Sequence, residues 1–375
     1  MLELRESDLL AVRLAPGPAW LDVLDAARDA GASVMPIDVR LPSPEVDELL
    51  RAARPSALLD DDGSSRLDGV PCEGDVALVM ATSGSSGRPR LVELTREAVS
   101  AAVEASLARL GPRVDDSWLC CLPVAHMGGL LVALRARAAG VPITFGPLEP
   151  GATLTAVVPT QLVRALDAGT DLSGFRAVLV GGAALDQAVA ARFSIVRTYG
   201  MTESAGGVVY DGLPLDGVEI RIASEDEIQL RGPMIMRAYR LDPEATARAF
   251  TGDGWLRTSD AGRIADGRLQ VLGRLDDAIV TGGEKVFPLE VETVLRAHPG
   301  VADVAVGGRP DPEWGARIVA FIEAAGESPS LEELRAFARA RLPAFKLPRE
   351  LVVVDALPRT PLGKVRLRDL LDRGA

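Results

Sequence analysis

The feature that most constrains this chain is a short apolar run, residues 76–80, that leads into a segment rich in glycine and hydroxyl groups. The run suits a buried strand, and Gly84 and Gly87 let backbone N–H groups behind it approach an anion. The surrounding side chains donate hydrogen bonds that suit phosphate: they are Thr82, Ser83, Ser85, Ser86, Arg88 and Arg90. A flexible linker uses the same small residues, but it needs neither a preceding strand nor two arginines. We therefore interpret this segment as a triphosphate-binding loop.

The spacing differs from that of the Walker phosphate loop, because Gly84 is followed by Ser-Ser-Gly-Arg-Pro and the Gly-Lys-Ser/Thr ending is missing. The segment instead resembles the phosphate loop of the adenylate-forming superfamily, which includes acyl- and aryl-CoA synthetases, luciferases and peptide-synthetase adenylation domains. The resemblance implies contacts with ATP from Thr82, Ser83, Gly84, Ser85, Ser86, Gly87 and Arg90. Arg90 stands where the family commonly has lysine, and we expect the phosphate contact to survive because arginine keeps the charge and adds a planar fork.

Composition restricts the class of protein. A chain of 375 residues with 47% hydrophobic content should form two or three hydrophobic cores. A net charge of −12 disfavours a large surface for nucleic acid or anionic lipid, so local cations must meet any anionic substrate. We see no apolar run of the roughly 20 residues that span a bilayer and no signal-peptide core, and we expect a cytoplasmic protein. Cys72, Cys120 and Cys121 lack metal or redox spacing, which predicts buried, reduced thiols.

Helical and strand patterns alternate along the chain. Residues 20–30 predict a helix, residues 33–37 a strand, and residues 177–180 a strand that leads into a glycine-rich turn. This alternation is typical of an α/β fold with layered sheets and helices. The superfamily resemblance, which extends from about residue 20 to residue 368, implies a large N-terminal domain at residues 1–273. It also implies a hinge and a small, mobile α+β C-terminal domain at residues 274–375.

Two helix starts carry clear local signals. Thr95 predicts the N-cap of a helix that ends at Gly111, and Ser330 with Glu333 predicts a capping box. The apolar residues of the first helix are spaced for one buried face, which we expect to consist of Val99, Val103, Leu107 and Leu110.

Residues 198–204, Thr-Tyr-Gly-Met-Thr-Glu-Ser, are the most specific short match to the superfamily. The resemblance places adenine beside Tyr199 and Gly200, and each further residue has a chemical use. Thr202 offers a hydroxyl to the α-phosphate, and Glu203 offers a hard oxygen ligand to Mg²⁺. The alternative interpretation is a turn at the end of a strand with a surface acid.

His126 lies in a turn of small residues, before an apolar helix. A lone histidine is usually a structural residue, but here the surrounding segment resembles the one whose histidine lines the acyl pocket of the superfamily. Gly181, Gly182 and Ala183 correspond to backbone that borders adenine and the acyl group. The alternative for these three residues is a tight strand-to-helix turn, and they do not form the dinucleotide fingerprint.

The C-terminal third matches further superfamily motifs. Asp260 corresponds to the aspartate that holds both ribose hydroxyls, although the family more often has glycine in place of the preceding Ser259. Arg274 would contact ribose or phosphate, and Asp276 would be the hinge between the domains. Surface turns also use these residue types, so the assignment depends on the order of the motifs.

Two more motifs concern the chemical steps of the reaction. Gly282 and Gly283 resemble the hairpin that enters the active site for thioester formation and leaves room for pantetheine. Lys364, in a Gly-Lys context, matches the catalytic lysine, for which a solvated surface lysine is the alternative. His298 is best explained as a structural residue.

Together the motifs imply an enzyme that uses ATP, Mg²⁺, CoA and a small carboxylic acid to form an acyl-adenylate and then a thioester. Residues 206–218 and the short N-terminal portion resemble the actinobacterial form of the o-succinylbenzoate–CoA ligase family of menaquinone biosynthesis. Three alternatives stay open: another aryl- or acyl-CoA ligase, a free-standing enzyme that loads a carrier protein, and a non-catalytic nucleotide sensor. We expect no nucleic-acid partner and no membrane span, and we leave open whether the chain forms a homo-oligomer.

Overall fold

The structure, a computed structural model, describes residues 3–82, 89–181, 193–359 and 365–372. The chain divides into two compact units. The first unit consists of Met1–Ala183, Val189–Arg221 and Gln229–Arg257, and the second of Ala184–Ala188, Ile222–Ile228 and Thr258–Ala375.

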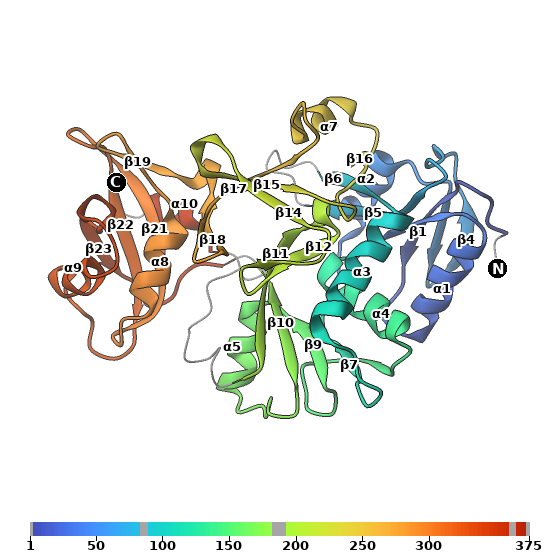
Figure 1. The fold of residues 1–375 in the computed structure, drawn as a ribbon, viewed down its shortest axis with the longest axis horizontal. Helices are drawn as coiled ribbons and strands as arrows, with labels where there is room; N and C mark the ends of the chain where they lie inside the picture. The colour runs from blue at the N-terminus through green and yellow to red at the C-terminus, as the bar shows by residue number, and fades with distance from the viewer. Residues whose placement is uncertain (1–2, 83–88, 182–192, 360–364, 373–375) are drawn as a thin grey trace. The chain divides into compact units, whose positions relative to one another are not determined.

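The first unit contains a seven-stranded sheet of order β16-β6-β5-β2-β1-β3-β4 (Figure 1). Its strands are β1 (Leu9–Arg13), β2 (Ser33–Pro36), β3 (Ala57–Asp60), β4 (Gly63–Arg66), β5 (Val76–Thr82), β6 (Arg90–Thr95) and β16 (Ala238–Tyr239). Strands β5, β2, β1 and β3 are parallel, whereas β4, β6 and β16 pair antiparallel with their neighbours. Helix α1 (Pro18–Asp29) contacts β2, and α2 (Ser43–Ala53) contributes Val46, Leu49 and Ala53 to the core over this sheet.

A second seven-stranded sheet in the same unit has the order β13-β12-β11-β10-β9-β7-β8. Its strands are β7 (Trp118–Cys120), β8 (Ile143–Phe145), β9 (Leu154–Val157), β10 (Ala177–Gly181), β11 (Ile195–Met201), β12 (Gly206–Tyr210) and β13 (Leu213–Pro214). The other helices are α3 (Arg96–Leu110), α4 (Met127–Ala139), α5 (Pro159–Asp167) and α7 (Pro243–Ala249). Helix α3 contacts β5 and β6 of the first sheet and β12 of the second, so it lies between the two sheets.

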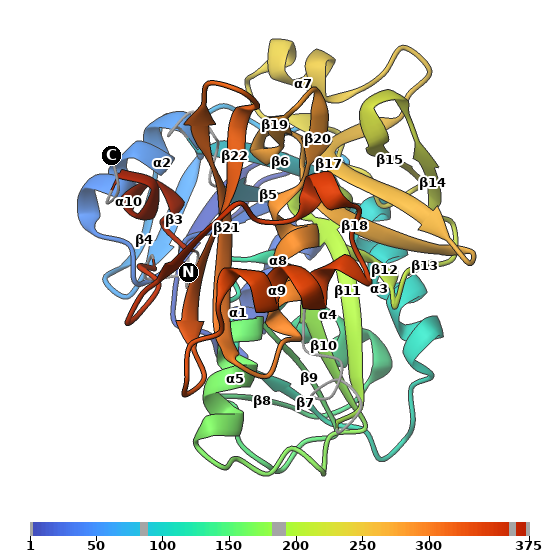
Figure 2. The same cartoon turned by 90° about the vertical axis from the view of Figure 1, so that its left-hand side faces the viewer.

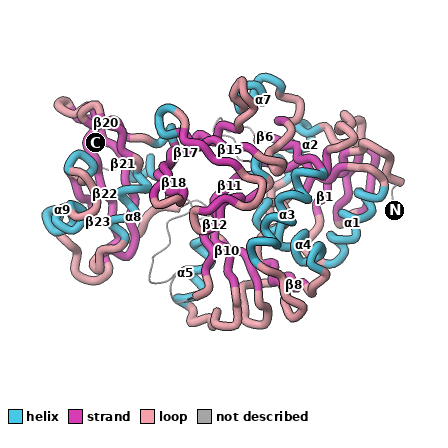
Figure 3. The backbone as a smooth tube through the Cα atoms, in the orientation of Figure 1, coloured by secondary structure: helices cyan, strands magenta, loops and turns pink. Residues whose placement is uncertain are grey.

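This architecture confirms the predicted α/β class for the first unit, in which strands and helices alternate along the chain (Figure 3). Strand β5 ends at Thr82, immediately before the predicted phosphate loop, and β11 ends at Met201, immediately before Thr202. Ligand sites in open α/β sheets lie beyond the carboxyl ends of strands. The fold therefore presents two of the predicted motifs where such sites occur.

The remaining strands and helices lie in the second unit or where the chain passes from one unit to the other. They are β14 (Glu219–Ile222), β15 (Glu227–Arg231), β17 (Leu256–Ala265), β18 (Arg268–Arg274), β19 (Ile279–Thr281), β20 (Glu284–Val286), β21 (Val301–Asp311), β22 (Gly315–Ala324), β23 (Glu350–Val353), α8 (Pro288–Arg296), α9 (Leu331–Arg339) and α10 (Leu367–Leu371). Strands β21, β22 and β23 form one sheet, and β19 and β20 form a separate hairpin.

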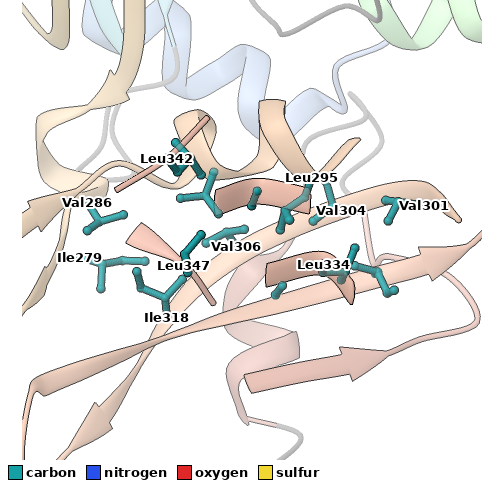
Figure 4. Close-up of a cluster of buried hydrophobic side chains, with 14 residues drawn as sticks. Ile279, Val286, Leu295, Val301, Val304, Val306, Ile318, Leu334, Leu342 and Leu347 are labelled. Carbon is teal, nitrogen blue, oxygen red and sulfur yellow. The ribbon is translucent and has the colours of Figure 1, made fainter. Parts of the chain in front are cut away.

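The sheet of the second unit separates two cores, because alternate residues of a strand point to opposite faces. On one face, side chains of β21 and β22 pack with α8 and α9, which lie side by side (Figures 2 and 4). Val306, Leu295 and Leu334 illustrate this core. On the other face, Phe321 packs with Leu370 of α10. The mixed sheet and helices agree with the α+β character predicted for the C-terminal part.

The local helix signals are confirmed, but the predicted face of α3 is only partly right. The Thr95 hydroxyl accepts a hydrogen bond from Ala98 N at 3.0 Å, and Ser330 and Glu333 form the capping box. Of the four apolar residues expected inside α3, only Val103 is buried; the other buried residues are Ala98, Ala102, Ala105 and Ser106. Small side chains face inward because α3 must fit closely between two sheets and α4.

Two other expectations from composition can be compared with the structure. Cys72 and Cys120 are buried and Cys121 is partly buried, and all three are free thiols. Burial raises the pKa of Cys120 to about 12, so this thiol stays protonated and unreactive near neutral pH. Within the described parts of the chain, no helix is long and apolar enough to cross a bilayer.

We predict that Phe321→Ala destabilises the second unit by about 3–5 kcal/mol, because Phe321 is 1% exposed and its removal opens a cavity. Hydrogen exchange of the β21–β22 amides, followed by mass spectrometry, measures this loss as reduced protection. Val353→Ala is the matched control in the neighbouring strand: Val353 is 50% exposed, and we expect a change below about 0.5 kcal/mol. Equal protection in the two variants would show that Phe321 does not support this core.

Candidate active site

The end of β5 and the start of β6 frame the predicted phosphate loop. Thr82 and Arg90 are partners in the antiparallel register, and the Thr82 hydroxyl lies 3.5 Å from the carbonyl oxygen of Arg90. The Arg90 side chain is exposed and can meet an anionic ligand. Five predicted loop residues lie outside the described part of the chain: Ser83, Gly84, Ser85, Ser86 and Gly87.

A tight turn connects β11 to β12 and carries Thr202 and Glu203 in a short 3-10 helix, Thr202–Ser204. The Ser204 hydroxyl closes this turn: it accepts a hydrogen bond from Met201 N at 3.0 Å and donates to the Gly206 carbonyl at 2.9 Å. Gly200 is required by close packing, since a Cβ there would lie 1.9 Å from the same carbonyl oxygen. The sequence motif therefore has a structural cause: the crowded end of β11 fixes the positions of Thr202 and Glu203.

Glu203 is buried, and its carboxylate has a partner that sequence patterns did not indicate. The hydroxyl of Tyr239 in β16 donates a hydrogen bond to Glu203 Oε1 at 2.8 Å. The guanidinium carbon of Arg90 lies 5.5 Å from the centre of the Tyr239 ring. Burial and the nearby Glu203 carboxylate raise the pKa of Tyr239, so its hydroxyl remains a donor at neutral pH. The structure thus brings Arg90 and Glu203 together around one tyrosine.

Glu203 fits the expected Mg²⁺ ligand. Mg²⁺ is commonly bound by one or two carboxylates together with substrate phosphates and water. Within the described ranges, no cluster of three or more histidine, cysteine, aspartate or glutamate residues could form a protein-only metal cage. A single buried carboxylate, linked through Tyr239 to Arg90, fits this shared mode of binding.

His126 immediately precedes α4, and its imidazole faces an acidic residue from another part of the unit. His126 Nε2 lies 3.7 Å from Asp38 Oδ2, and Arg40 Nε binds both oxygens of that carboxylate, at 2.9 and 3.1 Å. Partial burial lowers the pKa of His126 and the Asp38 charge opposes that shift. The Arg40 hydrogen bonds lower the pKa of Asp38, so this carboxylate is ionised at neutral pH.

The strand end at Gly181 lies beside the Tyr199 strand. Gly181 pairs with Thr198 in the parallel register of β10 and β11, and the Thr198 hydroxyl donates to the Val180 carbonyl at 3.3 Å. The predicted positions Gly182 and Ala183 lie outside the described residues. Tyr199 is partly buried at the end of β11, with its neighbour Gly200 at an irregularity in the strand register.

In the β17–β18 hairpin, Asp260 and Arg274 are register partners, and Arg274 Nη1 lies 3.0 Å from Asp260 Oδ1. This brings together two residues that were predicted separately to contact the nucleotide. Ser259 adopts φ of +57°, a left-handed conformation in which glycine is free of strain. That backbone explains why glycine suits this position, and Ser259 adopts it within strand β17.

The predicted hinge and hairpin also have defined conformations. Asp276 is exposed within a 3-10 helix, Leu275–Asp277. Gly282 and Gly283 connect β19 to β20 with φ of +59° and +84°, as a two-residue hairpin turn requires. Lys364 lies outside the described residues.

Because the chain has only two histidines, the charge state of His126 can be measured directly. We predict an NMR titration of His126 with a pKa below 6.5, and a still lower pKa in Asp38→Asn, since a nearby carboxylate stabilises the imidazolium. His298→Gln assigns the two signals, and the His298 signal of Asp38→Asn is the internal control. A His126 pKa that rises in Asp38→Asn would contradict the electrostatic contact.

The AMP-binding enzyme family matches residues 63–240, and the AMP-binding enzyme C-terminal domain matches residues 290–364. A protein named Probable 2-succinylbenzoate–CoA ligase from Mycobacterium tuberculosis is 37% identical, with 97% of this chain and 98% of that protein covered. A feruloyl-CoA synthase from Amycolatopsis is 32% identical, with coverage of 96% and 88%.

Among solved structures, o-succinylbenzoate CoA synthetase from Bacillus subtilis, in complex with an acyl-adenylate intermediate, superimposes with a TM-score of 0.82. It is 26% identical, and the match covers 98% of this chain and 88% of that one. The same enzyme in complex with ATP and a magnesium ion gives a TM-score of 0.80 at 26% identity, with coverage of 98% and 90%. The fold, the order of motifs and these similarities together place the chain in the AMP-binding, adenylate-forming enzyme family.

Proposed function

We propose that this protein is an ATP-dependent acid–CoA ligase that converts 2-succinylbenzoate, also called o-succinylbenzoate, to its CoA thioester through an acyl-adenylate. The observation that carries the proposal is the similarity to a protein of that name along nearly the full length of both chains. The resemblance of residues 206–218 to that ligase family favours the same substrate. This reaction belongs to menaquinone biosynthesis, and we infer a cytoplasmic location.

The first half-reaction joins the acid to AMP. A carboxylate oxygen attacks the α-phosphorus of ATP, the bond to pyrophosphate breaks, and an acyl-adenylate forms. Negative charge builds on the α-phosphoryl oxygens and on pyrophosphate, so donors fixed beforehand toward those atoms lower the barrier. We assign this role to Thr202, Arg90, Lys364 and the residues of the phosphate loop. Glu203 would hold Mg²⁺, which would neutralise part of the phosphate charge.

The nucleoside and the acid need separate contacts. We propose that Tyr199, Gly200 and the backbone of residues 181–183 border adenine, and that Asp260 accepts hydrogen bonds from the ribose hydroxyls. The ion pair between Asp260 and Arg274 holds the aspartate in place, and Arg274 can add a contact to ribose or phosphate. We assign His126 to the wall of the acyl pocket.

The second half-reaction forms the thioester. The CoA thiolate attacks the carbonyl carbon of the adenylate, the carbonyl–phosphate bond breaks, and AMP leaves. We propose that a small domain, residues 274–375, turns about Asp276 between the two steps, which removes Lys364 and brings in Gly282 and Gly283. The large domain, residues 1–273, would hold the nucleotide until AMP leaves.

Another aryl-CoA ligase activity is the second candidate, favoured by the similarity to a feruloyl-CoA synthase. A carrier-loading enzyme would form the same adenylate and transfer the acyl group to a protein-bound thiol. A nucleotide sensor would bind ATP without exchanging pyrophosphate. A homo-oligomer also stays a proposal.

The substrate assignment predicts that the purified protein, with ATP, Mg²⁺ and CoA, forms AMP and a thioester from 2-succinylbenzoate in preference to ferulate, coumarate, benzoate and medium-chain acids. Mass spectrometry of the thioesters, in competition at equal acid concentrations, measures the ratio of kcat/KM values. If ferulate were the only acid converted to a thioester, the proposed substrate would be ferulate and not 2-succinylbenzoate. No AMP with any acid would reject the ligase proposal.

Domain alternation predicts that Lys364→Ala slows adenylate formation by about 10²–10³-fold, because one fixed donor to the transition state is lost. Conversion of supplied acyl-adenylate to thioester should stay within about twofold of wild type, since Lys364 leaves the site before that step. ATP–pyrophosphate exchange and rapid-quench thioester formation measure the two halves separately. Lys346→Ala is the matched control, because Lys346 already pairs with Glu290 at 2.6 Å. Equal loss in both halves for Lys364→Ala would contradict alternation.

A further inference from the structure

Tyr239 lies outside every motif that suggested the reaction, yet it contacts the proposed metal ligand. Its hydroxyl donates to Glu203 Oε1 at 2.8 Å, and the other carboxylate oxygen, Oε2, has no hydrogen bond or ion pair with any residue that the structure describes. A donor on one oxygen restricts rotation of the carboxylate and leaves the second oxygen for a metal ion. Such partners orient metal ligands in many proteins.

The segment that carries Tyr239 is held firmly by backbone hydrogen bonds. Met236 N donates to the Glu203 carbonyl at 2.7 Å, so this segment touches both the backbone and the side chain of Glu203. On either side of Tyr239, Arg237 N donates to the Glu93 carbonyl at 2.9 Å and Arg240 N donates to the Leu91 carbonyl at 2.7 Å. Tyr239 is therefore fixed to β6, the strand that leaves the predicted phosphate loop.

Arg90 completes the arrangement at the start of β6. Its guanidinium lies over the face of the Tyr239 ring, with 5.5 Å between the guanidinium carbon and the ring centre. A cation at this distance is attracted to the aromatic face. One ring thus contacts a cation from the phosphate loop and a carboxylate from the β11–β12 turn.

We propose that Tyr239 is a positioning residue for Glu203: its hydroxyl holds Oε1 so that Oε2 is presented to the divalent cation of a metal–ATP complex. The inference deepens the proposed function, because it concerns the metal–nucleotide step of that reaction. Through Glu203, Tyr239 would strengthen binding of the metal ion. Tyr239 itself would not contact the acid.

The test uses Tyr239→Phe, which removes the hydroxyl and keeps the ring beneath Arg90. With Mn²⁺ as the probe and ATP present without acid or CoA, electron paramagnetic resonance of free Mn²⁺ measures metal binding to the protein–ATP complex. We expect binding to weaken by about 10–100-fold. ATP binding in EDTA, measured by calorimetry, should change by less than about twofold, because the hydroxyl acts through the metal ligand.

Tyr210→Phe is the matched control. Tyr210 is also buried in the same unit, and its hydroxyl contacts the Ser106 hydroxyl at 2.7 Å and Arg135 Nη2 at 3.1 Å. We expect this variant to bind Mn²⁺ with ATP as wild type does. Wild-type Mn²⁺ binding by Tyr239→Phe, or equal weakening in the two phenylalanine variants, would overturn the proposal.

A double-mutant cycle with Glu203→Gln separates positioning from general damage. If Tyr239 acts through Glu203, Tyr239→Phe adds less than about twofold to the Mn²⁺ defect of Glu203→Gln. If Tyr239→Phe weakened Mn²⁺ binding as much in the Glu203→Gln background as in wild type, the inference would be overturned. A general loosening of the fold would give that result. These measurements use no acid, so thioester formation is judged separately: a wild type that binds Mn²⁺–ATP but forms no thioester contradicts only the proposed ligase.

Discussion

A buried arginine, Arg240, joins several parts of the first unit and holds the segment that carries Tyr239. Its side chain is 1% exposed, and its guanidinium donates to the Ala53 carbonyl at 2.7 Å, to Glu93 Oε1 at 3.2 Å and to the Val70 carbonyl. A buried charge is costly unless nearly all its donors are satisfied. These contacts tie the end of α2, the chain before β5, and strands β6 and β16 into one arrangement. The position of β16, and therefore of Tyr239 beside Glu203, depends on that arrangement.

Local chemistry explains which structural features could be predicted from the sequence. Thr95 and Ser330 cap helices with hydrogen bonds to residues three positions away, so a short pattern contains both partners. The strand at residues 76–80 was likewise evident from consecutive apolar residues. Tyr239 and Glu203 are separated by 36 residues and meet only because β16 pairs with β6. No local pattern contains that information, and the pairing of Asp38 with His126 was missed for the same reason.

Packing and backbone conformation account for other differences between sequence patterns and structure. Apolar spacing pointed to the larger side chains of α3, but a helix between two sheets has room mainly for alanine and serine on its buried side. At Gly282 the requirement is steric as well as conformational. A Cβ would lie 2.8 Å from the Trp314 ring, and Gly282 N donates to the Trp314 carbonyl at 2.8 Å. The hairpin proposed for thioester formation therefore has a fixed base within its own unit.

The proposed substrate places its own electrostatic requirement on the site. A dicarboxylic acid such as 2-succinylbenzoate keeps one charged carboxylate after the other is activated, and that charge needs cations or several donors. His126 has a lowered pKa, so it would be largely neutral at pH 7 and would offer a hydrogen bond without a full charge. Arg40 already binds the Asp38 carboxylate with three hydrogen bonds. The Asp38–Arg40–His126 cluster is therefore nearly balanced in charge, and it suits contact with the polar, uncharged part of an acid better than capture of its second carboxylate.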